Sequence, residues 1–133
     1  MKQFRLNELP ISCDGKHILA GIMPGEYLAY GGLVFEKAGF RAHTNDGPGG
    51  TDYHVHEDCE AFVILQGKGF VEINKTQFHP TIAGDVIIIE PGEDHHLTSS
   101  EEDPLVVIWC HAGPERNEKQ VISTKSIEGD EKS

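Results

Sequence analysis

Short apolar runs alternate with glycine, proline, asparagine and aspartate turns along most of the chain, and few segments carry the 3.6-residue period of a helix. The pattern predicts strands over residues 28–34, 39–43, 53–56, 61–65, 69–73, 76–82, 86–90, 95–98 and 105–110. Strands 61–65 and 69–73 are expected to pair as a hairpin around Gly67 and Lys68. This organisation predicts an all-β sandwich or barrel.

The 133 residues are enough for one domain. We expect residues 26–112 to form the barrel. Residues 1–25 form an N-terminal extension that could contribute a strand to a partner subunit. Residues 113–133 turn polar and charged, which predicts a C-terminal extension that ends in a polar tail.

The charge balance excludes several classes of partner. Acidic residues outnumber basic ones 22 to 11, so neither nucleic acid nor an anionic membrane is an expected partner. No apolar run is long enough to cross a bilayer, and the first residues lack the apolar core of a signal peptide. The 3 cysteines have no CxxC spacing, which fits a reducing cytoplasm.

Histidine supplies the candidate chemistry, with 8 in the chain. On a strand, His54 and His56 would share a face and could bind one ion. Glu60 begins the next predicted strand, and the turn at Pro91 and Gly92 can fold His95 back toward it. Three imidazoles and a carboxylate predict one divalent first-row metal ion per chain (Fe, Mn, Ni, Zn or Cu) with positions left for water, substrate or dioxygen.

The other histidines are expected to play smaller parts. His96 follows His95 and should point to the opposite face, as a surface or interface residue. His79 alternates with Phe78 on its strand and should also point outward. His43 and His111 lie near strand ends, where either could reach the barrel mouth or support the ligands.

Three tyrosines and an arginine are further candidates for contact with a substrate. Tyr53 directly precedes His54 and should face away from the ligands, into the core or an interface. The roles of Tyr27 and Tyr30 are left open by the sequence. Arg41 could bind an anionic substrate group, although an exposed arginine is the default.

The strand that begins at Glu60 is expected to form one wall of the site. Phe62 and Ile64 share strand parity with Glu60 and should line the wall of an apolar cavity on the same face. Cys59 should point away from the metal and act as a structural thiol.

Two linked motifs give the chain a resemblance to the cupins. The first cupin motif, G-x5-H-x-H-x3,4-E-x6-G, is matched by residues 54–67, and the second, G-x5-P-x-G-x2-H-x3-N, is matched in most positions by residues 84–99. The sequence departs at Pro48, Glu90 and Ser99, where the motifs have glycine, proline and asparagine. These positions belong to turns and loops, so no ligand is lost.

The resemblance implies a single antiparallel jelly-roll β-barrel with a metal held by His54, His56, Glu60 and His95. Cupins include dioxygenases, isomerases, epimerases, lyases and decarboxylases, so the fold does not select the reaction. We expect an enzyme that acts on a small organic molecule, with a dioxygenase-type oxidoreductase as the first prediction. A non-redox lyase or isomerase for a sugar-like or hydroxy acid substrate and a non-catalytic ligand-binding cupin are the alternatives. By analogy, a homodimer is expected.

Overall fold

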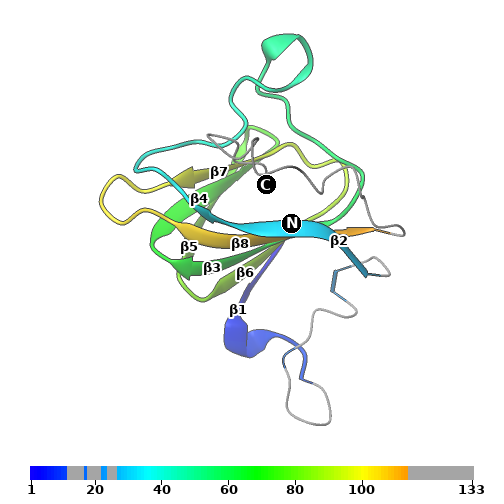
Figure 1. The fold of residues 1–133 in the computed structure, drawn as a ribbon, viewed down its shortest axis with the longest axis vertical. Coiled ribbons are helices and arrows are strands. Elements are labelled where there is room, and N and C mark those ends of the chain that lie inside the picture. The colour runs from blue at the N-terminus through cyan, green and yellow to red at the C-terminus, as the bar shows by residue number, and fades with distance from the viewer. Residues whose placement is uncertain (12–16, 18–21, 24–26, 114–133) are drawn as a thin grey trace.

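The computed structural model describes residues 1–11, 17, 22–23 and 27–113, and Figure 1 shows their arrangement. Within these residues the regular elements are strands and two short 3-10 helices. They are β1 (Lys2–Arg5), η1 (Leu6–Glu8), β2 (Tyr27–Phe35), η2 (Pro48–Gly50), β3 (Glu60–Gln66), β4 (Lys68–Ile73), β5 (Gln77–Ile82), β6 (Asp85–Ile89), β7 (His95–Ser99) and β8 (Val106–Gly113).

The strands form two antiparallel sheets, which confirms the prediction of an all-β fold of the jelly-roll barrel type. The larger sheet has the order β1-β6-β3-β8-β2, and the smaller has the order β5-β4-β7. β1 pairs with β6 of the same chain, so residues near the N-terminus add a strand to this sheet. Most of the predicted C-terminal extension lies outside the described residues, and its boundary stays a prediction.

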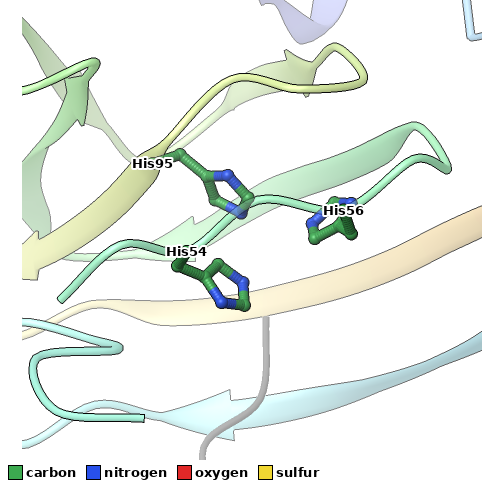
Figure 2. Close-up of side chains that lie close together, drawn as sticks. All are labelled: His54, His56 and His95. Carbon is green, nitrogen blue, oxygen red and sulfur yellow. The ribbon is translucent and has the colours of Figure 1, made fainter. Parts of the chain in front are cut away.

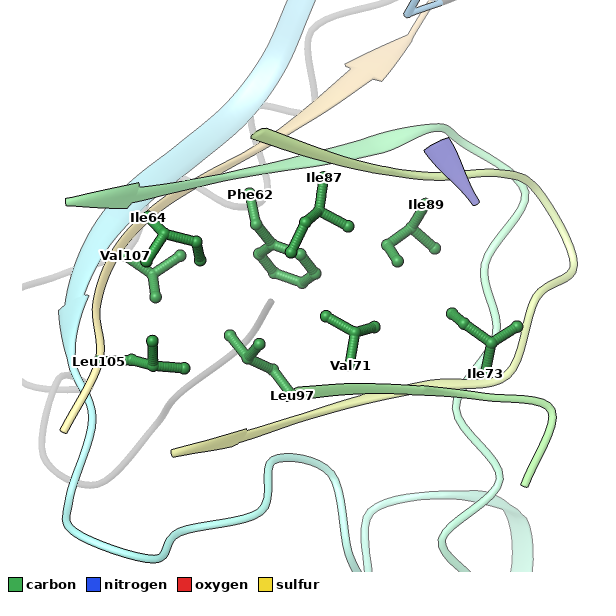
Figure 3. Packing of buried hydrophobic residues seen from close by; sticks show 9 residues of the cluster. All are labelled: Phe62, Ile64, Val71, Ile73, Ile87, Ile89, Leu97, Leu105 and Val107. Carbon is green, nitrogen blue, oxygen red and sulfur yellow. The ribbon is translucent and has the colours of Figure 1, made fainter. Parts of the chain in front are cut away.

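The main core lies between the two sheets, where alternate residues of facing strands meet (Figure 3). In β3, Phe62 and Ile64 share the face of Glu60, as predicted, but they are fully buried in the main core instead of lining a cavity. The cluster consists of Phe62, Ile64, Val71, Ile73, Ile87, Ile89, Leu97, Leu105 and Val107.

A second cluster covers the outer face of the larger sheet. Val86 and Ile88 of β6 pack there against Leu9 and Met23, while Ile87 and Ile89 face the main core. All residues of β6 are therefore buried, on both faces of the sheet. This explains why the strand carries an unbroken apolar run rather than an alternating one.

The predicted hairpin of residues 61–65 with 69–73 is wrong, because β3 and β4 belong to different sheets. The chain crosses from one sheet to the other at Gly67, whose φ of 88° favours glycine. A Cβ atom at Gly67 would also run into the backbone carbonyl of Pro104. Gly67 therefore marks a crossing between sheets and not the tip of a hairpin.

The predicted strands 39–43 and 53–56 are also wrong. Residues between β2 and β3 form a long loop that contains η2 and pairs with β7 only through an isolated bridge between Arg41 and Thr98. The N–H of Ala42 donates to the carbonyl of Leu97, so the loop lies along the edge of β7. In the described part of the chain, no helix is long and apolar enough to span a membrane.

Candidate metal centre

Three of the four predicted ligands are imidazoles that converge from the loop before β3 and from the start of β7, as Figure 2 shows. His54 and His56 lie in the loop before β3, and His95 is the first residue of β7. Their ligand atoms lie within 4.8 Å of one another. The N–H of His95 donates to the carbonyl of His54 at 3.2 Å, and the N–H of Gly92 donates to the carbonyl of His56 at 3.0 Å. Backbone hydrogen bonds to the β6–β7 turn, and not strand alternation, therefore bring these histidines together.

Glu60, the fourth predicted ligand, is fully buried at the start of β3. Its Oε1 lies 3.1 Å from Nε2 of His56 and 3.1 Å from Nε2 of His95. Two ligand atoms at adjacent octahedral positions, each about 2.1 Å from an ion, would be roughly 3.0 Å apart. These separations fit neighbouring positions in one coordination shell.

Backbone carbonyls fix which ring nitrogens face Glu60. Nδ1 of His56 lies 2.8 Å from the carbonyl of Asp58, and Nδ1 of His95 lies 2.8 Å from the carbonyl of Glu93. A carbonyl only accepts hydrogen bonds, so both Nδ1 atoms must donate. In a neutral imidazole the Nε2 atom then carries a lone pair, and two such lone pairs would face a carboxylate oxygen. A proton or a metal cation must lie between them, and the donor set therefore fits a divalent ion.

The electrostatics favour an ionised carboxylate at the centre. Burial by itself raises the pKa of Glu60, but hydrogen bonds with His111, His56 and His95 outweigh it and hold the pKa below the ordinary range. Burial lowers the pKa of His56, but the contact with Glu60 outweighs burial and raises it. A metal ion must compete with a proton at His56, so its affinity should rise with pH.

His111 is a member of this cluster whose role the sequence left open. It lies directly opposite Glu60 in the β3–β8 register, and its Nε2 is 3.1 Å from Oε2 of Glu60. The ligand atoms of His56, Glu60 and His111 also lie within 4.8 Å of one another. Strand alternation could have indicated that His111 points inward, because it lies on the same face of β8 as the buried Val107.

His43, the other histidine left open, stacks on His54 with ring centroids 3.5 Å apart and an angle of 2° between the planes. Its Nδ1 lies 2.7 Å from Oδ2 of Asp46, and its φ of 61° is unusual for a residue other than glycine. A single ion cannot lie in two parallel ring planes. His43 is thus better placed to orient the ring of His54 than to share an ion with it.

The expectation that His96 points to the surface is wrong. Its side chain is fully buried, with Nδ1 2.9 Å from the carbonyl of Ala42 and Nε2 3.2 Å from Oδ1 of Asp94. The ring does leave the face of β7 opposite to that of His95, but the loop between β2 and β3 covers that face. Strand parity predicts the face and not what packs against it.

His79 is placed differently from the sequence prediction, and of the two places predicted for Tyr53, the core or an interface, the structure rules out the core. On β5, Phe78 and Ile82 are exposed, and His79 shares its side of the strand with the buried Thr81. Tyr53 is 51% exposed and therefore does not pack in the core. Alternation in β5 is regular, but the exposed face is the one that carries Phe78 and Ile82. Tyr53 lies in the loop before β3, where strand alternation does not apply.

Arg41 and Cys59 have protein partners. The guanidinium of Arg41 lies 2.9 Å from Glu72 and 3.1 Å from Asp52, so two carboxylates already occupy it. Cys59 is buried, its Sγ donates to the carbonyl of Ile89 at 3.2 Å, and burial raises its pKa to about 11. This agrees with a structural thiol. The side chains of Tyr27 and Tyr30 lie outside the described part of the structure.

The profile of the Cupin domain family matches residues 42–111, which is more than half of the chain, and the chain therefore belongs to the cupin family. No curated protein sequence matches the chain. The matched region contains His54, His56, Glu60 and His95 together with His43 and His111.

Among solved structures, the chain is similar to the plu4264 protein of Photorhabdus luminescens, with 21% identity, a TM-score of 0.49, and coverage of 62% of this chain and 60% of that one. It is also similar to a cupin protein of Bacteroides fragilis, with 22% identity, a TM-score of 0.44, and coverage of 74% of this chain and 67% of that one. Ectoine synthase of P. lautus matches with 18% identity, a TM-score of 0.43, and coverage of 74% of this chain and 70% of that one. The chain thus spans 60% of the length of the first of these proteins.

Proposed function

We propose that this cupin is a metalloenzyme that holds one divalent transition metal ion with His54, His56, Glu60 and His95 and acts on a small organic molecule. The observation that carries the proposal is the contact of one buried carboxylate oxygen of Glu60 with two imidazole Nε2 atoms whose Nδ1 atoms are engaged by carbonyls. A cation between these atoms would satisfy both Nε2 lone pairs and the carboxylate oxygen together.

Differences in burial give the site an open side. Glu60 and His95 are enclosed, whereas the side chain of His56 is 17% exposed and His54 is partly exposed. On the closed side, the ring of Phe62 lies 6.4 Å from that of His95. A substrate would therefore approach past His54 and His56, while apolar groups exclude water behind the ligands.

The reaction class that we propose first is oxidation by dioxygen. A redox-active ion held by these four residues would supply both a Lewis acid and electron transfer, and would keep coordination positions for substrate and dioxygen. The ionisable groups His43, Asp46, Asp58 and His111 all contact a ligand or one another. This arrangement favours chemistry at the ion over chemistry by a separate acid–base pair.

Metal content tests the site directly. We expect protein purified without chelators or a metal-affinity tag to contain about one transition metal ion per chain. Glu60→Gln keeps the size of the side chain but removes its charge, and it should lose the ion. His79→Gln, on edge strand β5, is the matched control and should keep it. Wild-type protein that takes up neither Fe(II), Mn(II) nor Zn(II), or a Glu60→Gln variant with unchanged content, would contradict the assignment.

Oxygen uptake tests the reaction class. Protein loaded with Fe(II) under anaerobic conditions is mixed with small hydroxy acids, enols or phenols in an oxygen electrode, and products are identified by mass spectrometry. Uptake that depends on both substrate and Glu60 supports oxidation. Product formation without oxygen uptake would contradict oxidation and indicate a lyase or isomerase. Saturable ligand binding without any product would indicate a ligand-binding protein instead of an enzyme.

A further inference from the structure

Asp58 places its carboxylate between two imidazoles of the cluster. Its Oδ1 lies 2.9 Å from Nδ1 of His56, and its Oδ2 lies 3.2 Å from Nδ1 of His111. The two imidazole rings are close neighbours, with centroids 4.6 Å apart. One partly buried side chain therefore contacts both rings on the side away from Glu60.

His111 lies between Asp58 and the carboxylate of Glu60. Its other ring nitrogen, Nε2, lies 3.1 Å from Oε2 of Glu60, while Oε1 of the same carboxylate faces His56 and His95. The edge-to-face contact with Trp109, whose ring centroid lies 5.7 Å away at an angle of 88°, restricts the orientation of His111. The two oxygens of Glu60 thus have separate sets of neighbours.

We propose that Asp58 and His111 are positioning residues that keep Oε1 of Glu60 directed at His56 and His95, the other candidate ligands that it contacts. The contact of His111 with Oε2 at 3.1 Å restricts rotation of the carboxylate about its terminal bond, and Asp58, which contacts both imidazoles, restricts the orientation of the His111 and His56 rings. This inference rests on the proposed function, because it assigns roles toward the ion that His54, His56, Glu60 and His95 hold. Neither residue belongs to the motif positions that predicted the ligands.

Zinc affinity provides a readout other than activity. Metal-free protein competes with a chromogenic chelator for Zn(II), and the dissociation constant is measured for each variant. Loss of a hydrogen-bond partner behind a ligand weakens metal affinity by about 10- to 100-fold. We expect a loss in this range for His111→Leu and about 10-fold for Asp58→Asn. The exposed neighbour Glu57, changed to Gln, is the control and should stay within about 2-fold of wild type.

A conservative variant separates positioning from general packing. Gln at position 111 keeps a polar side chain facing Glu60, so His111→Gln should recover most of the zinc affinity that His111→Leu loses. Urea unfolding of the metal-free variants reports on stability independently of Zn(II). If His111→Gln and His111→Leu bind Zn(II) equally weakly, a polar contact at Oε2 of Glu60 is not the cause of the affinity loss and the proposal is wrong.

Counting coordinated imidazoles distinguishes positioning from ligation. Pulsed electron paramagnetic resonance of the Cu(II)-loaded protein should show three imidazoles in both the wild type and His111→Gln. A fourth imidazole that disappears in His111→Gln would make His111 a ligand and overturn its role as a positioning residue. Wild-type protein that binds no metal would refute the proposed function itself, whereas equal zinc affinity in wild type and His111→Leu would refute only this inference.

Discussion

Replacing Asp94 by alanine should destabilise the fold more than any exposed acidic substitution. Asp94 is only 3% exposed in the turn between β6 and β7. Its Oδ1 accepts the backbone N–H of His54 at 2.7 Å and lies 3.2 Å from Nε2 of His96. Its Oδ2 pairs with the ammonium group of Lys75. One carboxylate thus joins the histidine loop, β7 and the β4–β5 turn.

The expected decrease in the free energy of unfolding can be estimated from the contacts of Asp94. A hydrogen bond with a charged partner contributes about 1.5–3 kcal/mol, and a buried donor left without an acceptor costs about 1–3 kcal/mol. The pair with Lys75 adds less than about 1 kcal/mol, because the Lys75 side chain is 40% exposed and is hydrated when unpaired. Asp94→Ala should therefore cost about 3 kcal/mol. Asp94→Asn retains an acceptor for the N–H of His54 and should cost about 1 kcal/mol.

Urea unfolding in the presence of a chelator measures this effect without any contribution from a bound ion. In thermal unfolding, the midpoint should fall by roughly 4 °C for each kcal/mol lost from the free energy of unfolding. Asp103→Ala changes an exposed aspartate and should stay within about 0.5 kcal/mol of the wild type. A loss below about 0.5 kcal/mol for Asp94→Ala would show that these contacts do not stabilise the loop, and the reasoning would fail.

Three further predictions concern the core, the crossing between the sheets and acid stability. Phe62→Ala should cost about 3–5 kcal/mol in urea unfolding because Phe62 is fully buried in the main core, and a loss below 1 kcal/mol would argue against tight packing there. Gly67→Ala should cost at least about 1 kcal/mol, because φ is 88° and the new Cβ meets the carbonyl of Pro104; an unchanged midpoint would contradict that geometry. Burial raises the pKa of both Asp85 and Asp94, but hydrogen bonds outweigh it and lower each pKa. Their contribution to stability is therefore present above about pH 4 and lost as pH falls through the folded-state pKa, so the urea midpoint of metal-free protein should drop between pH 7 and pH 3 and not stay constant.

Local patterns in the sequence determined much of this protein. Period-two alternation placed Phe62 and Ile64 on the face of Glu60, because side-chain direction in a strand depends only on its own backbone. The spacing of His54, His56, Glu60 and His95 indicated one cluster, and the structure brings these side chains together. The imidazole and carboxylate chemistry of a possible metal site follows from residue type alone.

Only the tertiary structure decided which surfaces meet. Gly67 was compatible with a hairpin, and long-range pairing instead placed β3 and β4 in different sheets. His96 has the parity of an outward residue, yet the loop that carries Ala42 covers it. His111 reaches Glu60 because β8 pairs with β3 across a large separation in sequence. A local pattern specifies the direction of a side chain, whereas its neighbours depend on contacts between distant segments, and it is those contacts that place Asp58 and His111 around the candidate metal ligands.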